Sequence, residues 1–367
     1  MVMVYARNSS TFVKGQLIRG WSKLETVERL HQAGSFTLVA PDYDGAGLND
    51  LYGSLAEPGI FVDDDGHYFG GTATTLTDDS TRPRLTITGK DDQQLLEERI
   101  FYPDEATEAP WAVAHYEPPT PITAGKALID SVSEQMGPAA LVSRRIATLT
   151  VENTATAGPS TISARLETSA EQQRIAAASV GTVSRNLTTD GALKFKAWNP
   201  VACGVEFSET RRNVRRWRRT VTAPTATTVI AGGAGDGTAR TFTTTSSATD
   251  PRWPRRRELF LDASSAGTAL GSKAEEARAA GEATASLEVE AEGIPGYGTV
   301  WKIGDFATVD VGGVNTQLQI VAVKTVWEAP NKMTRTVSLG TESLRGIDVL
   351  TRKIREAQQA SAGSSRR

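Results

Sequence analysis

Six arginines and a tryptophan lie close together in the run RRNVRRWRR, residues 211–219. Arginine pairs with phosphate and tryptophan stacks on bases, so the run could line a path for nucleic acid. It could instead be a two-faced strand whose arginines meet acidic residues of a neighbour or face a shared wet channel. We favour the neighbour, because the chain carries a net charge of −3 and we identify no second basic cluster. The side chains concerned are Arg211, Arg212, Arg215, Arg216 and Trp217.

Two further motifs suggest ligands but fit turns better. Asp63, Asp64 and Asp65 precede Gly66 and His67, which resembles the start of a calcium loop. The bidentate glutamate that ends such a loop is absent, so we expect a solvated hairpin tip. The glycine-rich residues 233–237 lack the spacing of a phosphate loop and also predict a turn. We therefore expect neither a metal nor a cofactor.

The sequence offers no constellation of catalytic residues. The carboxylate pairs Asp78-Asp79 and Glu97-Glu98 are adjacent residues, which do not face each other on a strand or a helix. There is no Gly-x-Ser-x-Gly elbow, and the histidines lack ligand-like spacing. Cys203 lies in an apolar strand context and predicts a buried structural thiol rather than a nucleophile. We therefore predict a protein that is not an enzyme.

Length and composition indicate several small β domains. The chain has 367 residues, enough for two or three domains, and its hydrophobic content of 39% is low for one compact core. The single cysteine excludes an intramolecular disulfide framework. No run approaches the length of a membrane span, and the first residues lack the order of a signal peptide, so we expect no stable membrane association.

The clearest strand pattern lies in residues 297–340. Alternating apolar residues predict three consecutive antiparallel strands, with Gly312-Gly313 as the first hairpin turn. The apolar phase changes between Ile320 and Val321, which predicts a β-bulge or a segment buried on both faces. Such a meander cannot bury its apolar face alone and needs more strands or neighbouring chains.

The remaining pattern predicts a mainly β protein with α+β insertions. Short helices are expected at residues 92–100, 124–136, 169–179 and 273–282. We divide the chain into five segments: a β domain (1–103), a helix-containing connecting domain (104–190), a β-rich middle domain (191–265), a helix with a second β domain (266–343), and a C-terminal helix with a disordered tail (344–367).

The C-terminal helix is predicted from an apolar stripe at helical spacing, which consists of Leu344, Ile347, Leu350 and Ile354. The stripe spans too few heptads for an independent coiled coil. It could dock on a partner or on its own copies, or it could pack on its own barrel.

The order of several segments resembles the hub-type minor tail proteins of long-tailed phages, especially those of actinobacterial phages. The resemblance covers most of residues 15–345. The segments that carry it are GWSKLETVERLHQAGSFTLVAP (20–41), IFVDDDGHYFGG (60–71), LTITGKDDQQLLEERIFYP (85–103), VEFSETRRNVRRWRRTVTAPTATTVIAGGAGDGTARTF (205–242) and KIGDFATVDVGG (302–313).

The resemblance implies a structural role in the virion. It implies two tail-tube-like β-barrels per chain, so that a homotrimer presents six barrels and adapts a sixfold tail tube to a threefold tip. The implied partners are the distal tail ring, the tape-measure protein, and a central fibre or receptor-binding protein, with DNA only in passage. The implied location is the tail tip, after synthesis in the host cytoplasm. Two alternatives stay open: a tail-associated cell-wall hydrolase, and a nucleic-acid-binding module that uses residues 211–219.

Overall fold

The protein is mainly β, as predicted, and the chain divides into two compact units. The first unit comprises Met1–Trp217 and Val289–Leu339, and the second includes Arg218–Glu288. The computed structural model describes residues 2–41, 57–79, 84–99, 115–116, 124–140, 145–155, 162–163, 183–189, 191–247, 251–264, 270–291, 294–312, 314–328 and 332–340. The five segments expected from the sequence do not coincide with these two units and stay a prediction.

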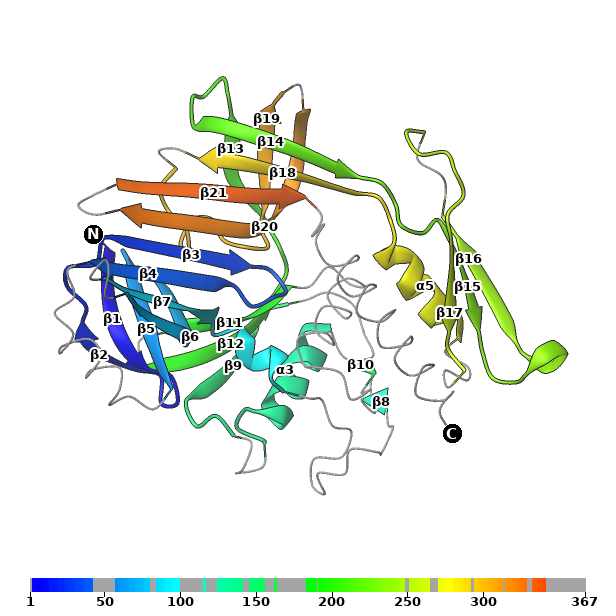
Figure 1. Ribbon diagram of the computed structural model, residues 1–367, viewed down its shortest axis with the longest axis horizontal. Coiled ribbons are helices and arrows are strands. Elements are labelled where there is room, and N and C mark those ends of the chain that lie inside the picture. The colour runs from blue at the N-terminus through cyan, green and yellow to red at the C-terminus, as the bar shows by residue number, and fades with distance from the viewer. Residues whose placement is uncertain are drawn as a thin grey trace. The chain divides into compact units, whose positions relative to one another are not determined.

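A 13-stranded sheet dominates the first unit (Figure 1). Its main path runs β14-β18-β21-β20-β3-β4-β7-β6-β5-β1-β2, and β19 joins β20 to β13. β14 and β18 also carry the chain between the two units. The strands are β1 (Val2–Asn8), β2 (Val13–Leu17), β3 (Lys23–Arg29), β4 (Ser35–Pro41), β5 (Pro58–Asp64), β6 (His67–Asp79), β7 (Arg84–Asp91), β13 (Ala202–Ser208), β14 (Val214–Thr222), β18 (Thr284–Ala291), β19 (Phe306–Val311), β20 (Val314–Glu328) and β21 (Lys332–Gly340).

One face of the N-terminal strands forms an apolar core because apolar residues occupy alternate positions along them. In β3, Leu24 is buried and its neighbours in sequence are less so, and β7 repeats this with Leu85 and Ile87. Phe36 and Trp327 fill the same core. The same alternation brings Glu28 of β3 to the buried face, where its charge needs a partner.

The C-terminal meander has the predicted form. β19, β20 and β21 pair antiparallel in sequence order. Gly312 adopts a φ of 54° at the first turn, a conformation that favours glycine. The register of β20 against β21 shifts between Ile320 and Ala322, and both Ile320 and Val321 are buried. The register shift fits the predicted β-bulge, and the burial of two consecutive residues fits the predicted alternative of a segment buried on both faces.

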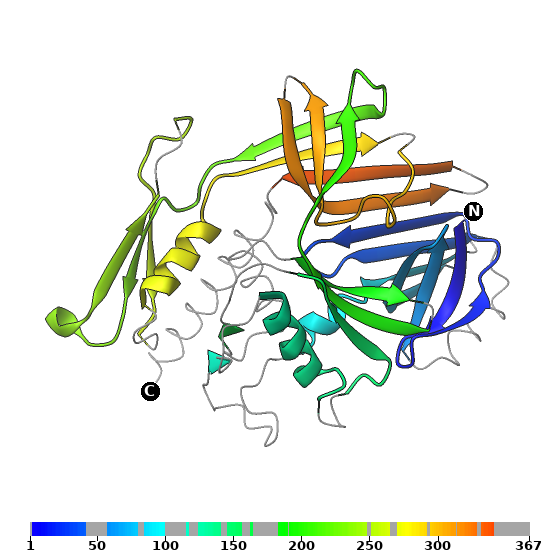
Figure 2. The same ribbon diagram turned by 180° about the vertical axis from the view of Figure 1, so that it is seen from behind.

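A smaller layer of the first unit combines a helix with a three-stranded sheet. Helix α3 (Ala124–Gln135) matches the predicted helix and packs on β12 (Ala192–Trp198) and β9 (Leu149–Asn153), with β11 (Val183–Thr189) at the other edge (Figure 2). Leu128 and Val132 of the helix meet Leu193 and Phe195 of the sheet. The layer also receives Leu96 of the short helix α2 (Gln94–Glu97). Two-residue strands β8 (His115–Tyr116) and β10 (Ile162–Ser163) pair separately.

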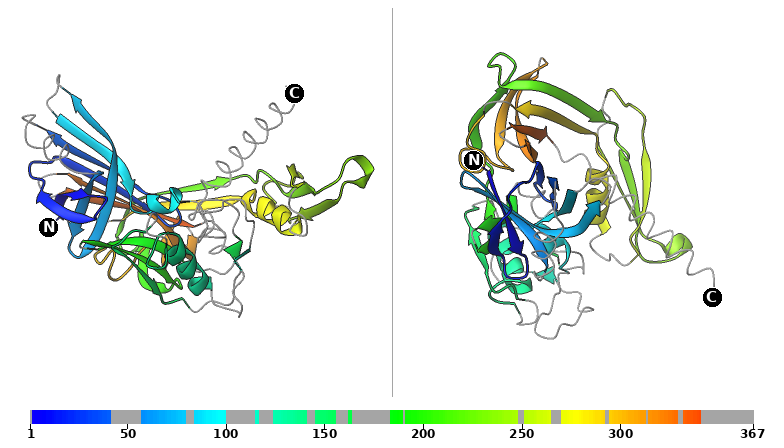
Figure 3. Two further views of the ribbon diagram at one scale, coloured as in Figure 1. Left: turned by 90° about the horizontal axis from the view of Figure 1, so that it is seen from below. Right: turned by 60° about the vertical axis from the view of Figure 1, so that its left-hand side comes forward.

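The second unit has its own small core. Its sheet has the order β16-β15-β17, and helix α5 packs on one face of it (Figure 3). Val229 and Ala231 of the central strand meet Ala274 of the helix. The elements are β15 (Thr228–Gly232), the 3₁₀ helix η1 (Gly237–Ala239), β16 (Phe242–Ser246), β17 (Glu258–Asp262) and α5 (Leu270–Ala280).

Some expectations need correction. The helix predicted at residues 92–100 shortens to Gln94–Glu97, because Asp91 ends β7 and Asp92 turns into the core. The Cys203 thiol is only partly buried in β13, where it donates a hydrogen bond to the carbonyl oxygen of Phe306. The helix expected at residues 169–179 lies outside the described residues. Among the described helices, none is long and apolar enough to cross a membrane.

Candidate functional site

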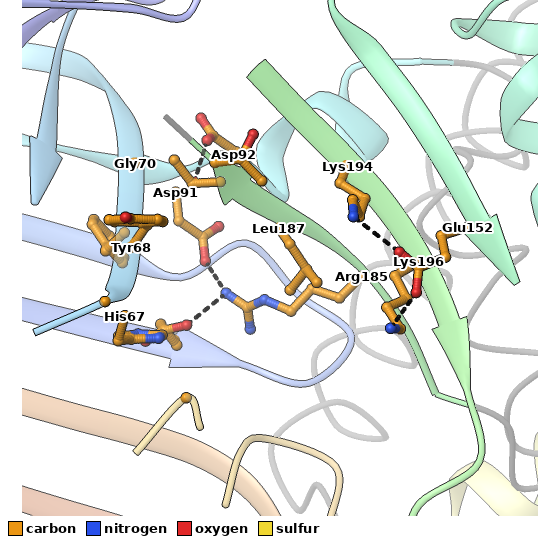
Figure 4. A pocket seen from close by; sticks show the side chains of 16 residues that line it. His67, Tyr68, Gly70, Asp91, Asp92, Glu152, Arg185, Leu187, Lys194 and Lys196 are labelled. Carbon is orange, nitrogen blue, oxygen red and sulfur yellow. Dashed lines mark hydrogen bonds and ion pairs between the residues drawn. The ribbon is translucent and has the colours of Figure 1, made fainter. Parts of the chain in front are cut away.

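A group of buried charged side chains lies where the main sheet meets strand β11 (Figure 4). Strand alternation explains how they arrive there: Glu28 follows Leu24 in the inward phase of β3, and Asp91 follows Ile87 in that of β7. Arg185 enters from β11. Together with the half-buried His67 and the buried Tyr297, which contact Glu28, we call this group the ionic cluster; its charged members are Arg7, Glu28, Asp91, Asp92 and Arg185.

The first pair of the ionic cluster joins strand β1 to the residue that follows strand β7. Arg7 of β1 donates from Nη1 to Oδ2 of Asp92 at 2.9 Å, and a second bond joins Nη2 to Oδ1. The exposed fractions of these side chains are 0% and 3%. Thr188 of β11 donates to the same Oδ2 at 2.6 Å. Gly70 makes room for the pair, because a Cβ there would lie 1.9 Å from Nη1 of Arg7.

Arg185 connects the smaller layer to the main sheet. Its Nη2 donates to Oδ2 of Asp91 at 2.7 Å and lies 3.5 Å from Oε2 of Glu28. Its Nη1 donates to the carbonyl oxygen of Arg29. The other carboxylate oxygen of Asp91 accepts from the backbone N–H of Gly34 at 2.8 Å. One guanidinium therefore holds two acids that lie on separate strands.

Glu28 extends the ionic cluster to the C-terminal part of the first unit. His67 Nε2 lies 2.9 Å from Oε1 of Glu28, and the hydroxyl of Tyr297 donates to the same oxygen at 3.0 Å. The rings of His67 and Tyr297 are 4.5 Å apart. Arg335 of β21 lies 4.8 Å above the Tyr297 ring and donates to Asp64 at 3.0 Å.

Burial and charge move the pKa values of the two central acids in opposite directions. Burial raises the pKa of Asp91 to about 7, assisted by the charges of Glu28 and Asp92 and opposed by Arg185. Burial also acts to raise the pKa of Glu28, but His67, Arg185 and the Tyr297 hydroxyl together lower it to about 2. Burial would lower the pKa of Arg185, whereas the charges of Asp91 and Glu28 raise it above its ordinary value.

A cavity of about 270 Å³ opens beside the ionic cluster. The face of the smaller sheet opposite α3 lines one side, where Lys194 donates to Glu152 at 2.9 Å and Lys196 donates to the same carboxylate. The acids that line the cavity thus face cations of the same chain. Within the described residues, no group of three or more histidine, cysteine, aspartate or glutamate side chains could hold a metal ion. The arrangement therefore joins layers of the fold, and we assign no reaction to it.

The structure places the predicted arginines at the edge of the main sheet. Arg211 and Arg212 lie in the turn before β14, and β14 is the last strand of the sheet path. Arg211 pairs with Glu206 of β13 at 2.6 Å. Arg215 and Arg216 lie 3.6 and 3.4 Å from Glu290 of β18.

Trp217 fixes the neighbouring turn. Its indole N–H donates to Oε1 of Glu209 at 3.0 Å, and the other oxygen of Glu209 accepts from the backbone N–H of Gly312 at 2.9 Å. A Cβ on Gly312 would lie 2.4 Å from the Trp217 ring. The indole thus stacks on the turn between β19 and β20. The predicted contacts of the arginines with partners or a lumen stay a prediction, and Leu344, Ile347, Leu350 and Ile354 lie outside the described residues.

Two features were missed at the level of sequence. The ionic cluster left one signal: Glu28 and Asp91 occupy the inward phase of their strands, where a charge needs a partner. The second is another basic group, formed by Arg252 and residues 255–257 in the second unit. Residues 211–219 are therefore not the single basic cluster that we expected.

Solved structures of low sequence identity share this fold. The tail protein from *Neisseria meningitidis* MC58 matches with a TM-score of 0.58 and 16% identity over 94% of this chain and 98% of that chain. The prophage MuSo2 43 kDa tail protein from *Shewanella oneidensis* matches with a TM-score of 0.58 and 17% identity over 92% and 97%. The prophage tail protein gp18 from *Listeria monocytogenes* EGD-e matches with a TM-score of 0.51 and 10% identity over 96% and 98%.

The family follows from the sequence itself. No curated protein sequence matches the chain. The profile of the Siphovirus ReqiPepy6 Gp37-like protein family, in contrast, matches residues 3–341. That range includes every segment that carries the resemblance to phage tail proteins. The chain therefore belongs to the Siphovirus ReqiPepy6 Gp37-like protein family, and its resemblance to phage tail hub proteins is confirmed.

Proposed function

We propose that the protein is a structural hub at the tip of a phage tail, a homotrimeric ring that adapts the sixfold tail tube to a threefold tip. The observation that carries the proposal is that the main sheet consists of two halves from the two ends of the first unit. Strands β1 to β7 form one half, whose apolar core also receives Trp327 of β20. Strands β13, β19, β20, β21, β18 and β14 form the other, and the two meet where β20 pairs with β3.

Two sheet halves per chain suit a symmetry adaptor. If each half occupies one tail-tube-like position, three copies provide six positions around one axis. The fold shared with a bacterial tail protein and two prophage tail proteins supports this arrangement, since those proteins match nearly along their full lengths. The partners that follow are the distal tail ring, the tape-measure protein, and a central fibre or receptor-binding protein at the tail tip. DNA would contact the ring only in passage.

The sheet edges are the surfaces through which copies would meet. Within the described residues, β2 and β14 end the strand path and β13 ends the branch through β19, so each of the three pairs with one strand only. An unpaired edge presents free backbone donors and acceptors that a neighbouring chain can satisfy. A ring requires such head-to-tail contacts to close.

The oligomeric state tests the proposal. We expect native mass spectrometry of the purified protein, alone or with the adjoining tail protein, to show three copies of the chain. Replacement of Arg215 or Arg216 by proline removes a backbone N–H on opposite sides of β14, so one of the two variants should lose the trimer if that edge pairs. Arg215→Ala and Arg216→Ala are the matched controls, because they keep the N–H.

Two results would overturn the proposal. One is a monomer at high concentration in both preparations. The other is release of sugars or peptides from host cell wall, which would support a hydrolase instead. An image of the assembled tail with this chain labelled would test the location.

A further inference from the structure

One face of the sheet in the second unit carries exposed aromatic side chains. Alternation turns Val229, Leu259 and Leu261 toward α5, so the next residues point to the opposite face. Phe242 and Phe260 lie there with exposed fractions of 57% and 54%. Ile230 pairs with Phe260 in the adjacent strand, so β15, β16 and β17 all contribute to this face. We call the surface formed by Phe242, Phe260 and Ile230 the aromatic face.

Arg240 holds the two rings in place. Its guanidinium carbon lies 5.8 Å from the ring centre of Phe242 and 5.5 Å from that of Phe260. The same guanidinium donates to the carbonyl oxygen of Gly232 at 3.2 Å and to Asp262 at 2.6 Å. A Cβ on Gly232 would lie 2.8 Å from the guanidinium, so glycine makes room for it. The rings are therefore braced while half of their surface remains exposed.

Such a face has the composition of a contact surface. Aromatic residues and arginine are enriched in the buried centres of protein interfaces, and contiguous exposed apolar patches mark interaction sites. Within the described part of the second unit, α5 packs on the other face of the sheet, where Thr245 donates to Glu275 of that helix at 2.6 Å.

The C-terminal segment of the chain has the matching pattern. Leu344, Ile347, Leu350 and Ile354 recur at intervals of three and four residues, which predicts one apolar stripe on a helix. Residues 344–354 would form a helix about 16 Å long. An apolar stripe of this kind is stable in water only when it packs on another apolar surface.

The segment follows a strand that lies beside the chain leading out of the second unit. Strand β21 lies next to β18 in the sheet, and the two arrows run in opposite directions (Figure 1). Gly340 therefore ends β21 near the beginning of β18, which follows α5 of the second unit by only a few residues. The residues between Gly340 and Leu344 can span about 13 Å when extended.

Charged side chains border the aromatic face. Glu258 and Asp262 flank Phe260 on β17, where Glu258 pairs with Arg256 and Asp262 with Arg240, both at 2.6 Å, and the exposed fractions of the two acids are 54% and 60%. Arg352, Lys353 and Arg355 surround Ile354 in the C-terminal segment. We propose that residues 344–354 form a helix that covers the aromatic face of the same chain. This contact is independent of the proposed trimer.

Hydrogen exchange followed by mass spectrometry tests the contact in the full-length protein. In the variant with Phe242→Ser and Phe260→Ser, we expect amides of residues 342–356 to exchange about tenfold faster or more, because their apolar cover is lost. In Leu350→Asp, amides of β17 should exchange faster in return. Val300→Ser is the matched control, since Val300 is 62% exposed in the first unit. Unchanged exchange in residues 342–356 would overturn the proposal.

Cross-linking separates a contact within one chain from a contact between copies. Phe260→Cys and Ile347→Cys are introduced together after Cys203→Ser removes the native thiol. We expect a short bismaleimide to give a product of monomer mass, with the two peptides joined. A product of dimer mass, or no cross-link at all, would overturn the assignment to the same chain. Either result leaves the trimer prediction untouched, because that prediction rests on strand edges of the first unit.

Discussion

Arg185 and Arg216 carry the same charge in opposite surroundings of the first unit. The Arg185 side chain is 6% exposed and holds two acids, whereas that of Arg216 is 81% exposed and lies 3.4 Å from one. Water screens the exposed pair and weakens it, but leaves an interior charge almost unscreened. A buried arginine therefore stabilises the fold through its interior ion pairs, while an exposed arginine on a sheet edge can also contact a partner protein.

The two arginines also differ in what surrounds their acids. Asp91 and Glu28 lie on different strands. Without Arg185, Asp91 would lose its ion-pair partner, and Glu28 would keep His67 and the Tyr297 hydroxyl. Glu290, which faces Arg216, also lies near Arg215, so it keeps a partner when either is lost. The sequence draws attention to the exposed run because its arginines are close together. The arginine expected to contribute more to the stability of the fold is Arg185, which stands alone in the sequence.

The largest effect is expected for Arg185→Met. We expect the free energy of unfolding to fall by about 3–5 kcal/mol, because the substitution leaves Asp91 and Glu28 buried without their shared cation. Chemical denaturation with a probe in the first unit measures the change. A loss below about 1 kcal/mol would show that water reaches the ionic cluster and that burial does not distinguish the two arginines.

Gly70→Ala disturbs the packing around Arg7 of the ionic cluster without removing a charge. A Cβ at this position meets Arg7, Thr188 and Asp92, so we expect a loss of up to about 3 kcal/mol from overpacking. Gly271→Ala is the control: it lies in α5 with nothing within 4 Å, and the same change should be neutral or stabilising by up to about 1 kcal/mol. Equal thermal shifts for both variants would contradict the close packing around Arg7.

The pH dependence of the unfolding free energy should distinguish Asp91 from Glu28. Asp91 has a folded pKa of about 7 against an ordinary value of 3.8, so its contribution is full below about pH 4 and is lost as the pH rises through 7. Glu28 behaves oppositely, because its pKa falls from 4.5 to about 2 and its contribution is lost as the pH falls through that range. We expect unfolding free energy to drop on the order of 2 kcal/mol between about pH 5 and pH 8. Asp91→Asn should flatten this limb, and an unchanged slope would contradict the assignment.

The smallest effect is expected for Arg216→Met. The free energy of unfolding should change by 0 to about 1 kcal/mol, because the ion pair is exposed and Arg215 remains near Glu290. The same variant also tests whether the exposed run binds DNA, measured as retention of the protein on immobilised DNA. If the exposed run binds nucleic acid, retention should weaken with added salt and weaken further in the variant. Retention that ignores salt would exclude that alternative.

Local features of the chain were predictable because their causes are local. The strands of the C-terminal meander, the register shift after Ile320 and the hairpin tip at Asp65 and Gly66 follow from alternation and from residues that accept positive φ. The helix at residues 124–136 follows from its apolar stripe. The ionic cluster could not be predicted in the same way, because a charge in an inward position does not indicate which residue will pair with it.

The sequence by itself determined the strand periodicity, the main turns and, through its ordered segments, the family. Only the tertiary structure decided the partners: β3 pairs with β20, and Tyr297 bonds Glu28 across a separation of 269 residues. Alternation is a property of a few neighbouring residues, whereas a partner is selected by the whole chain as it buries apolar surface and satisfies interior charge. The same physics explains why Glu28 became part of the core and why the arginines of β14 remained at its edge.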